Sequence, residues 1–154
     1  MQRTMQRLLD MANALGYAVY FCGLRGDLLA CTVPALMRIF IDSRLTDSEQ
    51  QGHLAHELGH VYHDHPCIRH PQTANEHAIE RQADRFAARV LIDPIRYAEL
   101  ESVNPDQHYL ADELGVPIEY VHVYEAHCLT RVRGVTYTHA REGVGQWAHR
   151  VEVA

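Results

Sequence analysis

In the N-terminal part of the chain, one segment with a helical pattern is followed by three short strand-like runs. Over residues 2–15 apolar positions recur every three or four residues and Gly16 follows as a C-terminal cap, which predicts a helix. The runs 17–22, 28–32 and 37–42 are short, rich in apolar residues and separated by glycine and proline, which predicts strands. In the last run successive side chains should point to opposite faces, as in a half-exposed strand. The natural assembly is a helix followed by a three-stranded antiparallel sheet.

Two longer helices are predicted to follow. Residues 46–49 match a capping box, whose Thr and Glu side chains satisfy the first amide groups of a helix, and this helix should run to about residue 63. A second helix should cover 75–92, where apolar residues recur along one face. Asp93-Pro94 and Asn104-Pro105 each place a capping side chain before a proline, which is typical of the first turn of further short helices.

These elements predict an α+β fold with a helix pair packed on the sheet and a C-terminal helical subdomain. We expect a core over residues 1–95, the helical subdomain over 96–130 and a hairpin or loose extension over 131–154.

Composition and charge restrict the class of function. The chain has 154 residues, of which 47% are apolar and 22% charged, so it can bury a core. Its formal net charge of −6 argues against a phosphate-binding surface as the main function. The sequence has no run of eighteen apolar residues, so we expect no membrane span.

The cysteines and the start of the chain indicate a reducing compartment. The four cysteines form no CxxC pair and no dense disulfide framework, so free or buried thiols are expected. Arg3, Arg7 and Asp10 interrupt the first apolar residues, which is not typical of a secretion signal. We therefore expect a cytoplasmic protein.

The sequence His-Glu-Leu-Gly-His occupies residues 56–60, inside the first longer helix. Residues four apart share one helix face, so His56 and His60 can bind a single metal ion. Glu57 is rotated by roughly 100°, so its carboxylate can take a proton from an attacking water without binding the metal. A zinc ion and a carboxylate base are what hydrolysis of a peptide bond requires.

Histidine is abundant in this chain, so the motif alone is weaker evidence for a metal site. With 12 histidines, the motif would arise by chance with a probability of roughly 0.07. A surface helix that carries two unrelated histidines is the alternative interpretation.

A second half of the site is predicted on the next helix. Catalytic zinc usually takes three protein ligands, and Glu80 lies 20 residues beyond His60. Asp84 shares the helix face of Glu80 and is suited to accept the free ring N–H of a ligating histidine. The alternative is an exposed acidic face paired with Arg81 or Arg85. A motif of two histidines on the preceding helix favours the metal site.

The segments LAHELGHVYHDHP and NEHAIERQADRFAARVLI together resemble the ImmA/IrrE family of metallopeptidases. The resemblance covers residues 35–95 well and residues 1–130 more loosely. Members commonly carry a second Glu two residues after the first, where this chain has Gln82, so Glu80 is the expected ligand.

This resemblance implies a gluzincin-like zinc site. The matching positions are His56, His60 and Glu80 as metal ligands and Glu57 as the general base, and Asp84 also fits the pattern. It further implies an extended peptide as substrate, paired with residues 37–42 as the edge strand of the sheet. Family members typically cleave or inactivate a helix-turn-helix repressor of a mobile element, a prophage or a stress response.

The remaining histidines add candidates without a second motif. A metzincin site would need Gly at position 63 and His at position 66, where the chain has His and Pro, so that class is excluded. His53 could support His56, but a solvated histidine is the favoured interpretation. Four further histidines flank the site and could gather adventitious metal, but surface positions are the favoured interpretation for His63, His65, His70 and His77. Candidate donors to the oxyanion of the reaction are Tyr97, His108, Tyr109 and His127.

Residues 110–117 resemble the core of a helix-turn-helix. The following helix carries Glu119 and Glu125 and no Arg or Lys before Arg131, so phosphate would repel it. We interpret the segment as a helical packing unit and expect no nucleic-acid partner.

Two hypotheses from different classes follow. The first is a zinc endopeptidase that acts on a protein substrate. The second is a zinc-containing regulatory module that binds a repressor or DNA without hydrolysis. Glu57 separates them, because a structural zinc site does not need a carboxylate beside its first histidine.

Overall fold

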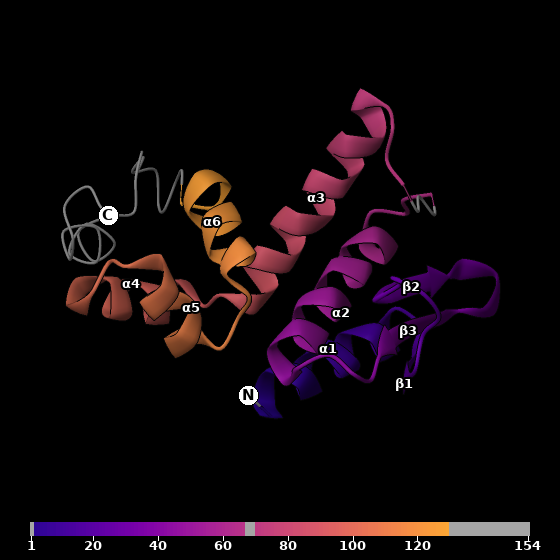
Figure 1. Cartoon of the computed structure of the whole chain (residues 1–154), viewed down its shortest axis with the longest axis horizontal. Helices are drawn as coiled ribbons and strands as arrows, with labels where there is room; N and C mark the ends of the chain where they lie inside the picture. The colour runs from indigo at the N-terminus through magenta and orange to yellow at the C-terminus, as the bar shows by residue number, and fades with distance from the viewer. Residues whose placement is uncertain (1, 67–69, 130–154) are drawn as a thin grey trace. The chain divides into compact units, whose positions relative to one another are not determined.

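The computed structural model describes residues 2–66 and 70–129 of the chain (Figure 1). The extension predicted over 131–154 lies outside these described residues. Within them, no helix combines the length and the apolar character that crossing a membrane demands.

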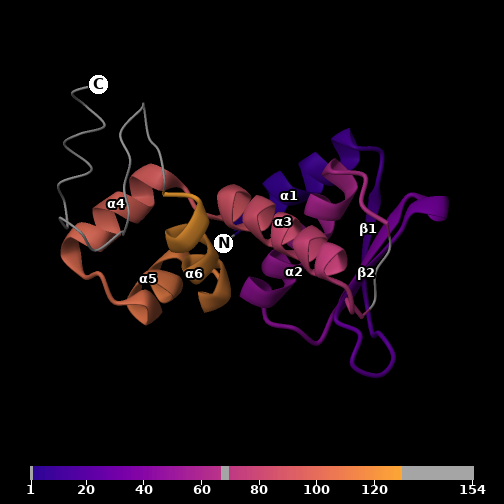
Figure 2. The same cartoon turned by 90° about the horizontal axis from the view of Figure 1, so that it is seen from above.

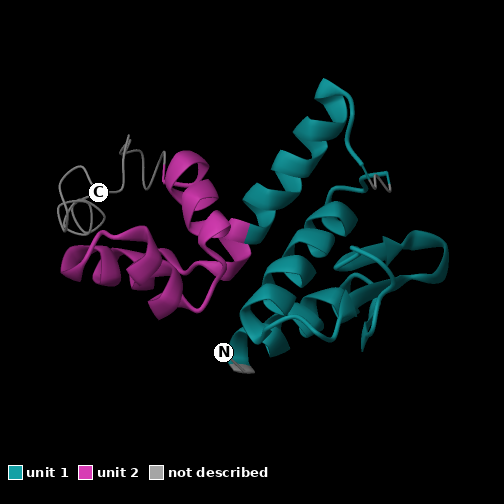
Figure 3. Cartoon of the chain, viewed as in Figure 1, with its two compact units in different colours: residues 1–87 teal, residues 88–154 magenta. Residues whose placement is uncertain are grey.

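The chain divides into two compact units, residues 1–87 and 88–154 (Figure 3). The helix α3 (Ala74–Leu91) runs through the division between them. The domain boundary expected after residue 95 therefore stays a prediction.

The first unit begins with α1 (Gln2–Ala14), which confirms the predicted N-terminal helix. Leu8 and Ala12, one turn apart, are fully buried and attach the helix to the core. Gly16 ends the helix with φ of +83°, a left-handed conformation that glycine adopts without steric cost.

The sheet has three short strands, β1 (Ala18–Cys22), β2 (Ala30–Val33) and β3 (Arg38–Asp42). Their order is β1-β3-β2, with β1 parallel to β3 and β2 antiparallel to β3. The α+β class is confirmed, but the sheet is mixed, so the prediction of an entirely antiparallel sheet is wrong. The prediction that 37–42 forms the edge is also wrong, because β3 is the central strand.

The connections explain both corrections. A short 3-10 turn, η1 (Pro34–Leu36), and Met37 with φ of 53° reverse the chain between β2 and β3, so those strands are antiparallel. The loop 23–29 carries β2 to the far side of β3, which leaves β1 and β3 as parallel neighbours. The central strand is also the most buried, with Ile39 and Ile41 fully inaccessible. Alternation along one strand predicts its faces but not its neighbours.

Two long helices follow the sheet, and both were predicted. The first, α2 (Asp47–Tyr62), begins at the expected capping box, where Thr46 and Glu49 bond reciprocally. It packs on α1 and on the sheet, and its fully buried side chains are Leu54, Ala55 and Leu58. The second, α3, buries Ala83 and Ala87. The two helices lie side by side in both views of the chain (Figures 1 and 2).

The second unit contains α4 (Pro94–Val103), α5 (Gln107–Leu114) and α6 (Ile118–His127). Asp93 caps α4 as predicted, whereas α5 is capped by Asp106 rather than by Asn104. Asn104 instead ends α4, and its side-chain oxygen accepts a hydrogen bond from the amide of Asp106. The core of this unit includes Tyr97, Leu100, Leu110 and Val121.

Candidate metal centre

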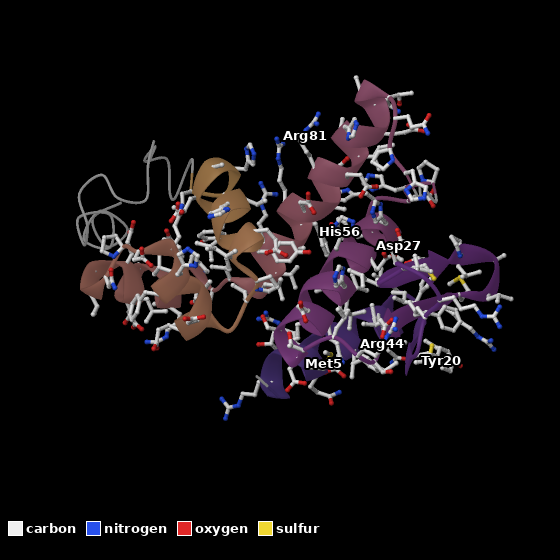
Figure 4. All side chains as sticks on the ribbon, viewed as in Figure 1. Met5, Tyr20, Asp27, Arg44, His56 and Arg81 are labelled. Atoms are coloured by element: carbon white, nitrogen blue, oxygen red, sulfur yellow. The ribbon has the colours of Figure 1, made fainter. Side chains whose placement is uncertain are left out.

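The predicted site residues meet where α2 faces α3. His56 and His60 lie one turn apart on α2, and Glu80 and Asp84 lie one turn apart on α3. Figure 4 shows His56 on the side of α2 that faces α3. Both helices belong, at these positions, to the first unit, so the site is built inside one compact body.

Gly59 allows the two helices to approach closely. A Cβ atom added to Gly59 would lie 2.9 Å from the Cα atom of Ala83 and 3.0 Å from its carbonyl oxygen. Both contacts are to backbone, which cannot move aside as a flexible side chain could. A glycine inside a helix costs about 1 kcal/mol relative to alanine. Its presence between His56 and His60 therefore reflects the packing of α3 against α2, a role that the motif alone did not reveal.

Three possible ligand atoms converge at this interface. The Nε2 atoms of His56 and His60 are 3.0 Å apart, and they lie 3.2 Å and 3.6 Å from the two carboxylate oxygens of Glu80. Ligands bound at 2.0–2.1 Å in a tetrahedral site lie roughly 3.3 Å from one another. The group formed by His56, His60 and Glu80 therefore has the dimensions of a site for one small divalent ion.

The polar atoms of the group also fit a metal. The Glu80 Oε1 atom is buried and has no hydrogen-bond partner among the described residues. A buried carboxylate oxygen without a partner is costly, and a cation at this position would satisfy it. The two imidazoles and one carboxylate are also a ligand set that zinc prefers at catalytic sites, where a fourth position stays open.

The second ring nitrogen of His56 faces Asp84. Its Nδ1 atom lies 2.8 Å from Asp84 Oδ1. The sequence predicted that Asp84 would face one of the ligating histidines, and the structure shows that the histidine it faces is His56. A carboxylate here accepts the Nδ1–H of the imidazole and leaves Nε2 directed at the ligand group.

The charges of His56, His60 and Glu80 shift one another's pKa values. Burial lowers the pKa of His56, but its hydrogen bonds with Asp84 and Glu80 outweigh burial and raise that pKa to about 10. The same contact with His56 lowers the pKa of Glu80. Burial and the neighbouring positive charge of His56 lower the pKa of His60 to about 4. Without a metal, His56 is therefore an imidazolium with a proton on each ring nitrogen, and a cation that binds to its Nε2 atom displaces the proton there.

Glu57 lies next to the ligand group but takes no part in it. Burial raises the pKa of its carboxyl group, and a hydrogen bond from Thr32 partly opposes that rise. The Thr32 hydroxyl donates to Glu57 Oε2 over 2.6 Å. Thr32 lies on β2, and sequence reasoning missed it because the contact depends on β2 packing against α2.

The contacts of two further residues near the site, His65 and Gln82, were not predicted. The ring of His65 contacts His60, and Gln82 on α3 bonds both His65 and His63. His63 and His65 were expected at the surface, but both are half-buried, whereas His70 and His77 are exposed as expected.

The candidate donors to an oxyanion all belong to the second unit. Tyr97 is fully buried, and its hydroxyl donates to Glu125 Oε1 over 2.9 Å within that unit. Burial and the nearby carboxylate of Glu125 raise the pKa of Tyr97 far above its ordinary value. An oxyanion role for Tyr97, His108, Tyr109 or His127 stays a prediction.

The chain matches the model of a known protein family. The family model Peptidase_M78, described as the IrrE N-terminal-like domain, matches residues 10–123. The match includes all of α2 and α3, and with them every residue of the candidate metal centre. A search among curated proteins found no significant match.

Proposed function

This chain belongs to the peptidase family of the IrrE N-terminal-like domain, and we propose that it is a zinc-dependent endopeptidase. In this proposal His56, His60 and Glu80 hold the metal and Glu57 is the general base. The observation that carries the proposal is the convergence of the two Nε2 atoms on the Glu80 carboxylate, with the half-buried carboxylate of Glu57 one residue after His56.

The residues divide the chemistry between them. A bound zinc ion would polarise the scissile carbonyl and make water more acidic. Glu57 takes the proton from the attacking water and passes it to the departing amine. Thr32 holds one oxygen of Glu57, which leaves the other free to meet the water. Asp84 holds the ring of His56 through Nδ1.

The edge strand β2 supports a protein substrate in extended form. In the described part of the chain, β2 pairs with β3 on one side only, so its other edge has backbone groups for pairing with a peptide. Thr32 on the same strand donates a hydrogen bond to Glu57, which supports a substrate bound along this strand near the proposed base. A peptide paired with β2 would therefore present its backbone carbonyls near the metal centre.

The proposed substrate is a helix-turn-helix repressor. This part of the proposal rests on the resemblance to ImmA/IrrE peptidases. The test is to mix the zinc-loaded protein with purified helix-turn-helix repressors of the same organism and to analyse each mixture by mass spectrometry, with and without a metal chelator. We expect a defined cleavage that the chelator abolishes and added zinc restores. A repressor that stays intact under both conditions argues against this substrate.

Replacing Thr32 tests the positioning of the base. Thr32→Val keeps the shape of the side chain and suits a strand, but it removes the hydrogen bond to Glu57. We expect kcat to fall about tenfold, as for the loss of a hydrogen bond to a charged group, with little change in KM. Thr32→Ser keeps a hydroxyl and should recover most of the rate. Equal kcat values for the Val variant and the wild type would show that Glu57 is positioned by other groups.

A further inference from the structure

A chain of polar contacts leads away from the outer nitrogen of His60. His60 Nδ1 lies 3.1 Å from His65 Nδ1, and His65 Nε2 lies 3.2 Å from Gln82 Oε1. Gln82 Nε2 in turn lies 3.1 Å from His63 Nδ1. The roles assigned so far to the metal centre use none of these contacts.

The end of α2 explains why His65 reaches back to His60. Asp64 adopts a left-handed conformation with φ of 54°. The amide of His65 then donates to the carbonyl of His60 over 2.9 Å, and the amide of Asp64 donates to that of Val61 over 3.2 Å. This pair of bonds is a Schellman motif, which brings the residue two positions beyond the cap onto the residue three positions before it. Here those residues are His65 and His60, so the helix end itself brings the two imidazoles into contact.

Ring packing and α3 hold His65 in this place. Its ring meets that of His60 edge-on, with centroids 5.2 Å apart, and lies nearly parallel to that of His63 at 5.3 Å. Gln82 follows Glu80 on α3 and bridges the two rings from the opposite helix. Both helices that form the metal centre therefore also contribute to the chain of contacts.

When both rings are neutral, the hydrogen bonds that link His60, His65 and Gln82 can point in two directions, depending on which nitrogen of His60 carries the proton. If His60 Nδ1 carries its proton, it donates to His65 Nδ1; His65 Nε2–H then donates to Gln82 Oε1, and the Gln82 amide donates to His63. In the reverse direction, His60 Nδ1 would be the acceptor, and the proton of the neutral ring would be on Nε2. A metal on Nε2 excludes that arrangement, because a ligating nitrogen carries no proton.

We propose that His65, oriented by Gln82, is a positioning residue that keeps the proton of His60 on Nδ1 and so keeps Nε2 available for zinc. The inference rests on the proposed metal site. In this arrangement the Nδ1 atom of each ligating histidine has its own hydrogen-bond partner, which is the Asp84 carboxylate for His56 and the neutral imidazole of His65 for His60. The orientation of the Gln82 amide, with its oxygen toward His65 and its nitrogen toward His63, already matches the direction that metal binding requires.

Zinc affinity, measured by competition with a chromogenic chelator, tests the proposal without an activity assay. His65→Ala should weaken zinc binding about tenfold to a hundredfold, as is usual when an outer partner of a ligating histidine is lost. His65→Asn should recover much of the affinity, because its side-chain oxygen can accept the same Nδ1–H. Gln82→Leu should weaken binding about two- to tenfold, the cost of one neutral hydrogen bond.

A double variant shows whether Gln82 acts through His65. Once His65 is alanine, the further change Gln82→Leu should have no additional effect on zinc affinity. His122→Ala is the matched control, because His122 is an exposed histidine of α6 in the second unit. It should bind zinc as the wild type does. If the losses of zinc affinity caused by His65→Ala and Gln82→Leu were additive, Gln82 would not act through His65, and this part of the proposal would be overturned.

Nitrogen-15 NMR of the zinc-loaded wild type reads the proton positions directly. We expect Nδ1 of His60 and Nε2 of His65 to carry protons, and a proton on Nδ1 of His65 would overturn the proposal. The variant His56→Ala distinguishes a failure of the positioning role of His65 from a failure of the proposed metal centre. If His56→Ala abolishes zinc binding while His65→Ala leaves it unchanged, only the positioning role fails. If His56→Ala retains tight zinc binding, the proposed metal centre itself fails.

Discussion

Glu57→Gln is expected to abolish peptide cleavage while zinc binding and the fold persist. General base catalysis contributes about 10²- to 10⁴-fold to a rate, and an amide cannot take the proton of the attacking water. The three proposed ligands are unchanged, and the new side chain can still accept the hydrogen bond from Thr32. The measurements are the rate of substrate cleavage, the zinc content and the melting temperature.

Stability provides an internal control for this variant. Burial raises the pKa of Glu57 in the folded protein, so ionisation of that carboxyl group opposes folding. The metal-free variant should therefore match the wild type at low pH, where the carboxyl group is protonated in both states. It should become the more stable of the two as the pH rises above the pKa of an unfolded glutamate.

A biological readout in which Glu57→Gln is as active as the wild type would contradict the peptidase assignment and favour a regulatory module that binds without hydrolysis.

Gly59→Ala is expected to open the metal centre through a single added methyl group. The new Cβ would lie 2.9 Å from the backbone of Ala83, so α3 has to move away from α2 and carries Glu80 with it. Overpacking costs about 1–3 kcal/mol, and the better helix propensity of alanine returns about 1 kcal/mol. The net loss of stability is therefore small. Zinc affinity should fall about a hundredfold, because a displaced ligand costs at least as much as a lost outer partner.

Two companion variants isolate the cause of this effect. Gly23→Ala adds a methyl group where no atom lies within 4 Å, and it should change neither zinc affinity nor stability noticeably. Ala83→Gly should not rescue Gly59→Ala, because the nearest atoms of Ala83 are its Cα and carbonyl oxygen rather than its side chain. Zinc binding by Gly59→Ala at wild-type affinity would show that the close approach of the helices is not needed.

Local sequence patterns predicted the elements that carry the site. The capping box at Thr46, the glycine cap at Gly16 and the apolar face of α3 depend on neighbours within a few residues, so they can be read along the chain. The contact of Asp84 with one of the two histidines followed from helical spacing on two successive helices, whereas the choice of His56 came from the structure. These predictions needed no knowledge of the tertiary arrangement.

Contacts that depend on the path of the chain in space could not be predicted in the same way. The order of the strands is decided by the 23–29 loop, which passes β3 and makes β2 the edge. That path alone brings Thr32 to Glu57. His65 offered a local signal that was not used, since Asp64 followed by His at the end of a helix is compatible with a left-handed cap.

We propose that His56, His60 and Glu80 hold one zinc ion between α2 and α3. An anomalous-difference map at the zinc absorption edge, from crystals of the zinc-loaded protein, tests it most directly. We expect a single peak per chain at about 2.0–2.2 Å from both Nε2 atoms and from a Glu80 carboxylate oxygen. A peak on other histidines or on cysteines, with the Glu80 side chain turned away, would contradict it.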